Sequence, residues 1–302
     1  MMGVRMIETN MGTTRPTVSV VIPTLNEARN LPHVFARLPA DIYEVIVVDG
    51  HSVDDTVDVA RRLRPDVRIV GQTRTGKGNA LACGFAAATG DVIATLDADG
   101  SADPAEIPRF VDALMQRGDF AKGTRFAADG GSNDITALRR AGNRVLSGIV
   151  NWLYGTRYSD LCYGFNAFWR CHVPILGLDG TEPPPADGRP LWGDGFEVET
   201  LINIRAAKAG LIVIEVPSFE HARIYGTTNL STFCDGMRVL RTILGERRRR
   251  RRAIPLVAPG TFSPLSPHAA AIVSEASNLA RAVVALPAAS LERGSLTGEA
   301  VE

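Results

Sequence analysis

Several features that assign proteins to specialised classes are missing from this sequence of 302 residues. The four cysteines include no C-x-x-C pair, so a zinc site or a redox dithiol has little support. No uninterrupted apolar run approaches the roughly 18 residues that span a bilayer, and the N-terminal segment MMGVRMIETNMG lacks the apolar stretch of a secretory signal. These absences favour a cytoplasmic protein with reduced cysteines.

An excess of charge of one sign is also missing. The 33 Lys and Arg residues balance 33 Asp and Glu residues, which gives a formal net charge of zero. A chain balanced in this way has no overall attraction for nucleic acid or for an anionic surface, so we expect no nucleic-acid partner, and any such attraction must be local. With 45% hydrophobic and 22% charged residues, the composition is that of an ordinary globular protein.

Strand and helix patterns alternate four times in the first half of the chain. The predicted strands are short β-branched or apolar runs at 18–22, 44–49, 67–70 and 91–99, the first of them stopped by Pro23. Helical patterns follow these runs at 26–38, 56–64, 79–89 and from 104. Such alternation predicts an α/β fold with a parallel sheet, in which ligands lie at the carboxyl ends of the strands.

Two of these helix starts carry capping patterns. Asp103 precedes Pro104 and stands three residues before Glu106, which predicts an N-cap closed by a capping box. Ser52 and Asp55 have the same spacing before the helix at 56–64. Both patterns predict a helix that begins soon after a strand ends.

The second half of the chain is less regular. Residues 138–154 predict an amphipathic helix whose apolar side carries Leu138, Val145, Leu146, Ile149, Trp152 and Leu153. We expect a loop at 181–190, a helix from 196 that ends at Gly210, and a strand at 211–217. Beyond Arg252 the sequence becomes rich in Pro, Ala and Ser, and we expect 253–302 to be mostly disordered.

An acidic pair closes the fourth predicted strand. Asp97 and Asp99 are one residue apart, so their carboxylates repel each other unless a cation lies between them. Oxygen ligands of this kind suit Mg²⁺ or Mn²⁺, and an ion held there would neutralise a leaving diphosphate. The alternative is a solvated turn with helix-capping acids.

Two further strand ends carry polar candidates. Asp49 either accepts hydrogen bonds from a nucleobase or ribose, or simply precedes a turn at Gly50. The segment from Gly71 to Gly78 nearly matches a phosphate-binding P-loop, but Gly78 stands where that motif has the Ser or Thr that holds magnesium. Lys77 is nevertheless well placed to contact a phosphate at a helix N-terminus.

Candidate groups for an acceptor come later in the chain. Four arginines around the start of the amphipathic helix either bind phosphate or form a solvated basic face, and they are Arg125, Arg139, Arg140 and Arg144. Asp194 and Glu197 lie at the start of the helix that ends at Gly210, where each is either a general base or a helix cap.

Seven motifs occur in a fixed order, and they are VVIPTLNEARNL, VIVVDGHSVDDT, GKGNAL, DVIATLDADGSADPAEI, KGTRF, DLCYGFNAF and RIYGTTNL. Together they resemble the family 2 glycosyltransferases with a GT-A fold, and most of all the polyprenyl-phosphate (dolichyl-phosphate) mannose and glucose synthases. The resemblance covers about residues 17–245. It implies a mostly parallel central sheet with helices on both faces, and an inverting, metal-dependent transfer of a hexose from a UDP- or GDP-sugar in the synthesis of a cell-envelope glycan.

The resemblance also implies donor-side roles for individual residues. It assigns the metal, Mg²⁺ or Mn²⁺, to Asp97 and Asp99. The residues that match the nucleotide-sugar pocket are Pro23, Glu27, Asp49, Lys77 and Asp97. Arg223 matches an arginine near the diphosphate, where it would take part in catalysis by stabilising the leaving group.

On the acceptor side, Arg125 and Arg140 match two arginines that meet the acceptor phosphate in the lipid-phosphate enzymes. An acceptor with a hydroxyl group would instead need a base, for which Asp194 and Glu197 are the candidates. We therefore expect a polyprenyl phosphate as the acceptor, with a saccharide or small-molecule hydroxyl as the alternative.

Three departures from the family pattern stand out. Gly50 replaces the second acid of the usual V-D-D, and Thr228 and Asn229 replace the usual Ser-Lys of the late segment. No transmembrane domain follows the last motif, although some lipid-phosphate synthases lack one as well. These departures bear on the choice of nucleotide and acceptor.

The expected organisation is a flexible N-terminus (1–16), one GT-A domain (17–246), and a basic run with a mostly disordered tail (247–302). Six consecutive arginines, 247–252, predict peripheral contact with the inner face of the plasma membrane. A P-loop nucleotide hydrolase is disfavoured by Gly78, and a non-catalytic nucleotide-sugar binder is disfavoured by the intact acidic pair.

Overall fold

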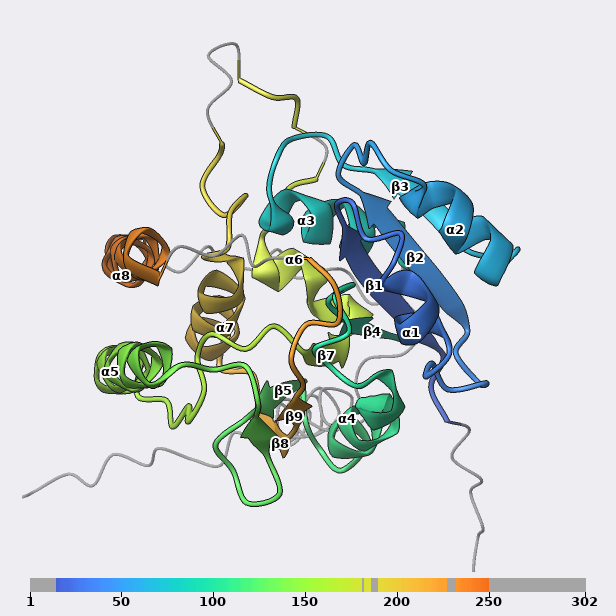
Figure 1. The fold of residues 1–302 in the computed structure, drawn as a ribbon. Coiled ribbons are helices and arrows are strands. Elements are labelled where there is room, and N and C mark those ends of the chain that lie inside the picture. Colours follow the sequence, from blue (N-terminus) through green and yellow to red (C-terminus); the bar gives the residue numbers. More distant parts are fainter. Residues whose placement is uncertain (1–14, 181, 186–189, 227–231, 250–302) are drawn as a thin grey trace, which may run out of the picture.

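Strand β1 (Val18–Thr24) lies inside a sheet of seven strands in the computed structural model (Figure 1). The strand order is β3-β2-β1-β4-β7-β5-β8, and only β7 runs antiparallel to its neighbours. The other strands are β2 (Glu44–Asp49), β3 (Arg68–Gly71), β4 (Val92–Thr95), β5 (Phe120–Thr124), β7 (Asn166–Trp169) and β8 (Val213–Pro217). The structure describes residues 15–180, 182–185, 190–226 and 232–249.

Helices cover both faces of the sheet because its central strands are apolar on both sides. On one face, Val20 and Ile22 of β1 share a core with α1 (Leu31–Phe35), α2 (Thr56–Leu63) and α4 (Ile107–Met115). On the other face, Val21 shares a second core with α3 (Lys77–Ala87), α6 (Val173–Leu176) and α7 (Val198–Ala209). The predicted α/β fold with helices on both faces is confirmed.

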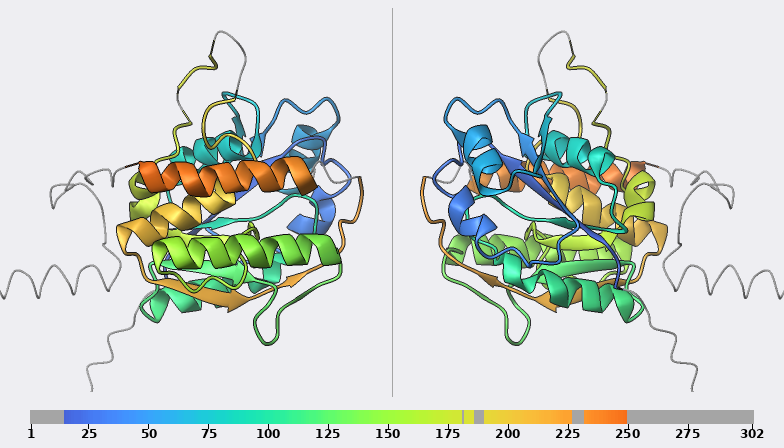
Figure 2. Two further views of the ribbon diagram at one scale, coloured as in Figure 1. Left: turned by 90° about the vertical axis from the view of Figure 1, so that its left-hand side faces the viewer. Right: turned by 90° about the vertical axis from the view of Figure 1, so that its right-hand side faces the viewer.

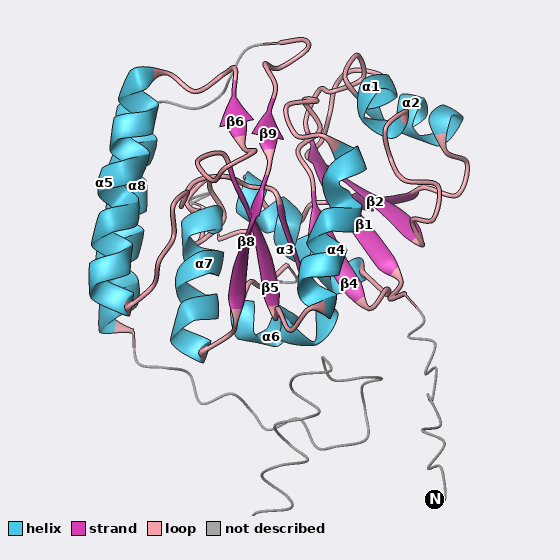
Figure 3. Cartoon of the chain, turned by 90° about the horizontal axis from the view of Figure 1, so that it is seen from below, coloured by secondary structure: helices cyan, strands magenta, loops and turns pink. Residues whose placement is uncertain are grey.

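Two long helices form a further layer outside α7. Helix α5 (Ala137–Tyr154) and helix α8 (Thr232–Arg248) lie beside each other across one side of the molecule (Figure 2, left). A third core joins them to α7 through Val150, Ile204 and Ile243. A small parallel sheet, β6 (Gly131–Ser132) with β9 (Phe219–Glu220), lies near the end of the main sheet at which α5 begins (Figure 3).

Helix α5 differs from the amphipathic helix that its sequence predicts. Leu146, Ile149 and Leu153 pack against the third core as expected. The other three members of the predicted apolar side, Leu138, Val145 and Trp152, are 70%, 62% and 80% exposed. The helix instead buries Asn143 and Ser147 beside Val150, because these polar side chains bond the neighbouring backbone.

Several predicted boundaries shift. Strand β1 continues through Pro23 to Thr24, beyond the last pair that it forms with β4. Helix α1 is shorter than the predicted 26–38, and Asn26, where the predicted helix began, has a positive φ of 58° that is not helical. Strand β4 ends at Thr95, so the acidic pair lies in the turn that follows the strand. The regular elements that remain agree with the predicted alternation.

The two capping patterns have different outcomes. Asp103 caps a short 3-10 helix (104–106) by accepting a hydrogen bond from the backbone N–H of Ala105, as predicted. Glu106 does not close a capping box, because its carboxylate bonds Ser218 and the N–H of Phe219. At α2, Asp54 accepts from the N–H of Thr56 at 3.0 Å, while the Ser52 hydroxyl accepts from Asn26. The capping role predicted for Ser52 is therefore wrong.

Other expectations fall on residues that the structure does not describe. These are most of the N-terminal segment, part of the loop 181–190, Thr228 and Asn229, and the tail from residue 250 onward. Within the described ranges, none of the helices is long and apolar enough to cross a membrane.

Candidate functional site

A cavity of about 890 Å³ opens at the carboxyl ends of the parallel strands and extends between α5 and α8. The predicted site residues that line it are Pro23, Glu27, Lys77, Asp97, Asp99, Arg125 and Arg223. Four others lie outside its lining, and they are Asp49, Arg140, Asp194 and Glu197. Most of the residues predicted for the donor site therefore line one cavity, as expected for residues near the carboxyl ends of parallel strands.

Each of the two acids after β4 forms an ion pair with a basic side chain. Asp97 Oδ1 lies 2.6 Å from Nζ of Lys77, the first residue of α3. Asp99 Oδ2 lies 2.9 Å from Nη2 of Arg223, on the chain that follows β9. The backbone N–H of Ser101 donates to Asp99 Oδ1 at 2.9 Å and fixes its orientation. Both carboxylates thus point toward positive charge inside the cavity.

Arg223 joins two acids from distant parts of the sequence. Its Nη1 lies 3.0 Å from Glu27 Oε1, while Nη2 holds Asp99. Burial raises the pKa of Glu27, against the lowering effects of Asn30 and Arg223. The chain around Arg223 is held in place because Tyr225 exchanges backbone hydrogen bonds with the Asn30 amide. Arg223 is therefore positioned at the predicted diphosphate end.

The acidic pair suits a divalent ion by its chemistry. Carboxylate oxygens are the ligands that Mg²⁺ and Mn²⁺ prefer. No cluster of three or more His, Cys, Asp or Glu side chains suitable for a metal occurs among the described residues. Asp97 and Asp99 would therefore hold an ion together with oxygens of the donor diphosphate or of water. The residues present fit a metal that arrives with its substrate.

Glu199 is a cavity residue that the sequence reasoning missed. It lies in the first turn of α7, and its Oε1 is 2.7 Å from Lys77 Nζ. Burial raises the pKa of Glu199, and the adjacent Lys77 opposes that rise. Burial disfavours the charge of Lys77, but Asp97 and Glu199 together hold its pKa above the usual value. In the sequence, Glu199 was one of two acids at the start of a helix, and nothing distinguished it from Glu197.

The segment 71–78 packs against the chain around Asp194 rather than forming a P-loop. The N–H of Gly78 donates to the Asp194 carbonyl at 2.8 Å. A Cβ at Gly78 would lie 1.7 Å from the Gly193 carbonyl oxygen, so a Ser or Thr does not fit there. The near-match to the P-loop therefore reflects close backbone packing, which contradicts the hydrolase alternative.

Asp194 and Glu197 are held by bonds to residues that do not line the cavity. Arg74 Nε and Nη2 donate to the two carboxylate oxygens of Asp194 at 2.9 and 2.8 Å, and both side chains are buried. Glu197 Oε1 accepts from the N–H of Gly193 at 3.2 Å. A catalytic role for either acid stays a prediction that these positions do not favour.

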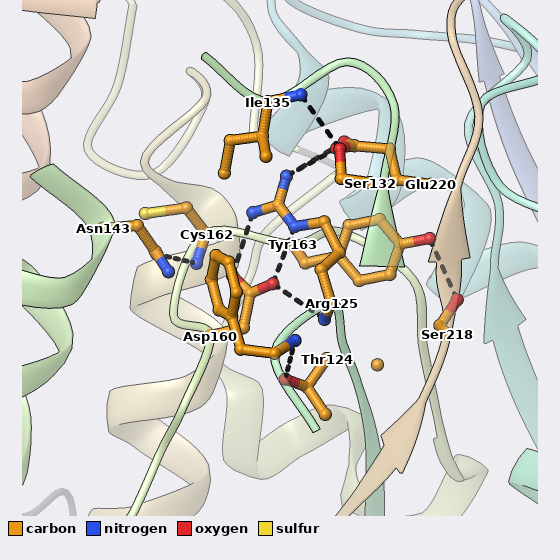
Figure 4. A network of polar contacts seen from close by, with 12 residues as sticks. Thr124, Arg125, Ser132, Ile135, Asn143, Asp160, Cys162, Tyr163, Ser218 and Glu220 are labelled. Atoms are coloured by element: carbon orange, nitrogen blue, oxygen red, sulfur yellow. Dashed lines mark hydrogen bonds and ion pairs between the residues drawn. The ribbon is translucent and has the colours of Figure 1, made fainter. Parts of the chain in front are cut away.

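Arg125 is bonded by two carboxylates (Figure 4). Its Nε and Nη2 donate to Asp160 at 2.7 and 2.9 Å, and its Nη1 donates to both oxygens of Glu220 at 3.0 Å. Although burial opposes the charge, these acids raise the pKa of Arg125, and Arg125 in turn keeps the pKa of buried Asp160 low. A phosphate would have to compete with both carboxylates, so acceptor binding by Arg125 stays a prediction.

The start of α5 presents only part of the predicted arginine cluster to the cavity, together with an amide that was not predicted. Arg139 lines the cavity, whereas Arg140 is exposed and lies over the Phe126 ring at 5.9 Å. Asn143 lines the cavity and is 4% exposed, and its Oδ1 accepts from the N–H of Cys162 at 3.1 Å (Figure 4). Its Nδ2 has no hydrogen-bond partner among the described residues. The sequence analysis considered only charged side chains as ligands of the phosphate, so it did not identify the buried amide of Asn143.

Comparisons with known proteins agree with this geometry. The family described as "Glycosyl transferase family 2" matches residues 19–173. An uncharacterized glycosyltransferase of Mycobacterium tuberculosis is 43% identical over 219 residues, which cover 71% of this chain and 89% of that protein. An undecaprenyl-phosphate mannosyltransferase of Micrococcus luteus is 29% identical over 223 residues, which cover 71% of this chain and 87% of that protein.

A solved structure shares the fold. It is the glucosyl-3-phosphoglycerate synthase of Mycobacterium tuberculosis, in complex with Mn²⁺, uridine-diphosphate and phosphoglyceric acid. The TM-score is 0.58 at 21% sequence identity, and the match covers 78% of this chain and 80% of that chain. At this identity the likeness concerns the fold alone.

Proposed function

The chain belongs to glycosyltransferase family 2, and on that basis we propose that it transfers a hexose from a UDP- or GDP-sugar to a polyprenyl phosphate. Support for the donor class comes from the solved neighbour, which holds uridine-diphosphate and Mn²⁺. Support for the acceptor class comes from the Micrococcus luteus relative, which is named for undecaprenyl phosphate.

The donor diphosphate belongs at the end of the cavity where Asp97 and Asp99 lie. A divalent ion bound there with the diphosphate would neutralise part of its charge. Arg223 and Lys77 lie within 3 Å of these acids and supply positive charge where the leaving group gains negative charge. Transfer then needs an acceptor oxygen on the far side of the anomeric carbon.

The observation that carries the acceptor assignment is the shape of the cavity. It continues from the acidic pair to an end between α5 and α8 that apolar Leu138, Leu146 and Val239 line together with the charged Asp134, Arg139 and Asp235. At that end Asn143 presents a buried N–H₂ with no partner among the described residues, which is a costly group to leave unbonded. A phosphate with a prenyl chain matches this pairing, since its head accepts hydrogen bonds and its tail is apolar.

A phosphate acceptor also agrees with the positions of the acids. It arrives as an anion and needs no strong base, whereas a hydroxyl acceptor must lose a proton. Asp194 and Glu197, the predicted bases, lie outside the cavity lining. A saccharide hydroxyl is the second candidate acceptor, and it would need Glu199, which is already bound to Lys77.

The outer surface of α5 and α8 suits a membrane. Leu138, Val145 and Trp152 are spaced by seven residues along α5, and Met237 and Leu244 have the same spacing on α8. Residues spaced in this way form one stripe on a helix. All five are at least 40% exposed, and the exposed arginines on the same two helices include Arg144, Arg241, Arg247 and Arg248. Apolar side chains flanked by arginines are typical of helices that lie in a membrane interface.

We therefore expect the protein to bind anionic phosphatidylglycerol vesicles and to leave them as salt increases. Each basic residue near such a surface contributes about 1 kcal/mol. Replacing Arg241 and Arg248 together with Gln should weaken vesicle binding roughly 25-fold, which sedimentation at several lipid concentrations measures. Trp152→Ser should weaken binding as well, because its ring is 80% exposed.

Matched controls lie at the other end of the sheet. Arg61 and Arg62 on α2 are exposed, and replacing both with Gln changes the net charge by the same amount. Val53 is 92% exposed, so Val53→Ser removes an apolar side chain there. These variants should bind vesicles like the wild type, and an equal loss in both sets would contradict a specific membrane face.

The transfer reaction itself is tested with farnesyl phosphate and undecaprenyl phosphate as acceptors. Labelled UDP-glucose, UDP-galactose and GDP-mannose are supplied with Mn²⁺, and the label should appear in a lipid product that mild acid releases as free sugar. Label that enters only oligosaccharides, with none in lipid, would overturn the phosphate acceptor in favour of the hydroxyl one.

A further inference from the structure

The two lining residues that directly follow β2 and β3 carry no charge. They are Gly50, after β2, and Gln72, after β3. The Asp49 carboxylate does not line the cavity, and its two oxygens accept from the N–H of Ser52 at 3.2 and 3.4 Å. This end of the cavity therefore presents the Gln72 amide to a ligand, where the sequence analysis predicted the Asp49 carboxylate.

The Gln72 amide lies beside the space that the glycine at position 50 leaves open. A Cβ on Gly50 would lie 3.4 Å from Gln72 Oε1 and 3.1 Å from the carbonyl oxygen of Thr24. An acid at position 50, as in the usual V-D-D, would therefore crowd the amide. Gln72 is 9% exposed, and its amide makes no hydrogen bond to any other described residue. Because a buried amide without a partner is costly, a polar ligand that bonds it gains affinity.

The distance of Gln72 from the acidic pair suits a nucleoside. In the strand order β3-β2-β1-β4, Gly50 and Gln72 follow strands that lie two and three places from β4, after which the acids come. At about 4.8 Å between neighbouring strands, these separations are roughly 10 and 14 Å. A ribose with its base extends over a comparable length from a diphosphate at Asp97 and Asp99. The base of the donor therefore belongs beside Gln72.

We propose that Gln72 bonds the nucleobase of the donor and selects a uridine nucleotide over a guanosine nucleotide. This inference rests on the proposed transfer from a UDP- or GDP-sugar, and it narrows the donor to a UDP-sugar. A primary amide accepts at its oxygen and donates at its nitrogen. The Watson–Crick edge of uracil offers N3–H as a donor beside O4 as an acceptor, so one amide satisfies both groups.

Guanine leaves one donor unbonded at the same amide. Its N1–H and O6 can pair with Gln72 as uracil does, but its N2 amino group is then a further donor without an acceptor. A carboxylate, which accepts at both oxygens, would bond N1–H and the amino group together. Gly50 supplies no carboxylate, and the Asp49 carboxylate faces its own turn. The unbonded amino group should weaken binding of guanosine nucleotides roughly 10- to 100-fold.

Three nucleoside diphosphates test the proposal on the unaltered protein. Isothermal titration with Mn²⁺ measures the Kd of UDP, of GDP and of inosine diphosphate, which is GDP without the N2 amino group. UDP should bind roughly 10- to 100-fold more tightly than GDP. Inosine diphosphate should also bind about tenfold more tightly than GDP, because the two ligands differ only in the unbonded amino group.

Replacing Gln72 with Glu should reverse the preference. The new carboxylate accepts from both donors of guanine, whereas it repels O4 of uracil. Its charge also repels the diphosphate of either nucleotide, so the measured quantity is the ratio of the two Kd values. This ratio should shift roughly 100-fold in favour of GDP. Gln116→Glu is the matched control, because Gln116 is exposed, follows α4 and lies outside the cavity lining. It should keep the wild-type ratio.

Thermal unfolding shows if Gln72→Glu folds, and the comparison of GDP with inosine diphosphate on the wild type decides if it does not. Tighter binding of GDP than of UDP, or equal binding of GDP and inosine diphosphate, would overturn the proposal and leave the proposed function intact. An unchanged ratio in folded Gln72→Glu, with a changed ratio in Asp49→Asn, would assign the base to Asp49. A wild-type protein that binds neither UDP nor GDP would overturn the proposed function as well, whereas failure of the polyprenyl phosphate alone would leave this binding test intact.

Discussion

Replacing Asp99 with Asn is expected to lower the rate of sugar transfer roughly a thousandfold. A bound metal typically supplies several kcal/mol of charge stabilisation to a leaving group, and each 1.4 kcal/mol, approximately, is a factor of ten in rate. Asp99 is also the carboxylate that Arg223 contacts at 2.9 Å. The substitution therefore removes a metal ligand and a partner of the second positive group in one step.

Metal binding should be measured directly as well as through activity. Titration of Mn²⁺ in the presence of UDP, followed by electron paramagnetic resonance of the free ion, should show tight binding to the wild type and weak binding to Asp99→Asn. Asp103→Asn is the matched control, because Asp103 is a nearby helix cap outside the cavity lining and Asn caps equally well. Undiminished transfer by the wild type in excess EDTA would exclude a metal-dependent reaction.

Replacing Arg125 with Ala should destabilise the folded protein by about 3–5 kcal/mol, since the buried Asp160 loses the guanidinium that neutralises it. The Asp160 side chain is 0% exposed and that of Arg125 is 8% exposed, so water cannot replace the lost partner. For a domain of this size the melting temperature should fall by roughly 10 °C. Arg125→Lys should fail to restore it, because one ammonium cannot bond two carboxylates bidentately.

An exposed ion pair provides the control for this prediction. Arg15 and Asp112 are 47% and 54% exposed, so Arg15→Ala should lower the free energy of unfolding by less than about 1 kcal/mol.

The effect of pH on the stability that Arg125 provides has a definite sign. Because Arg125 holds the folded pKa of buried Asp160 below its ordinary value, this stabilisation is present above the ordinary pKa and is lost as the pH falls through the folded pKa. The difference in melting temperature between the wild type and Arg125→Ala should therefore become smaller in acid. Equal melting temperatures of the two proteins at neutral pH would contradict the structural role of Arg125.

Part of the donor half of the site followed from the sequence because Glu27, Asp97 and Asp99 come soon after the strands β1 and β4. Parallel strands end at one edge, so Asp97 and Glu27 had to lie close together once the strands were correct. The family resemblance added Arg223, which lies far along the chain and which no local pattern connects to Asp99. Their contact at 2.9 Å agrees with that assignment.

The acceptor half was less predictable because it depends on tertiary packing. Arg125 was prominent as a basic residue, yet whether its guanidinium is free depends on Asp160 and Glu220, which other segments supply. Asn143 interrupts an apolar pattern and was therefore overlooked, although it is the buried group. Leu138 and Trp152 fitted a core-facing stripe, but helix α5 is covered on one side only, so the same periodicity also places them on the surface.

The pairing of β5 with β8 has a consequence for the order in which the chain can fold. Phe120 pairs with Val213, so β5 remains an open edge until the helices α5 and α7 and the antiparallel strand β7 have all been synthesised. Pairings between distant segments form slowly, and an unpaired edge is prone to bind other strands. Before residue 213 has been synthesised, the strands β1 to β4 of a nascent chain can already pair with one another. The edge of β5 that will bind β8 is then unpaired, and it could bind strands of other nascent chains translated from the same messenger RNA.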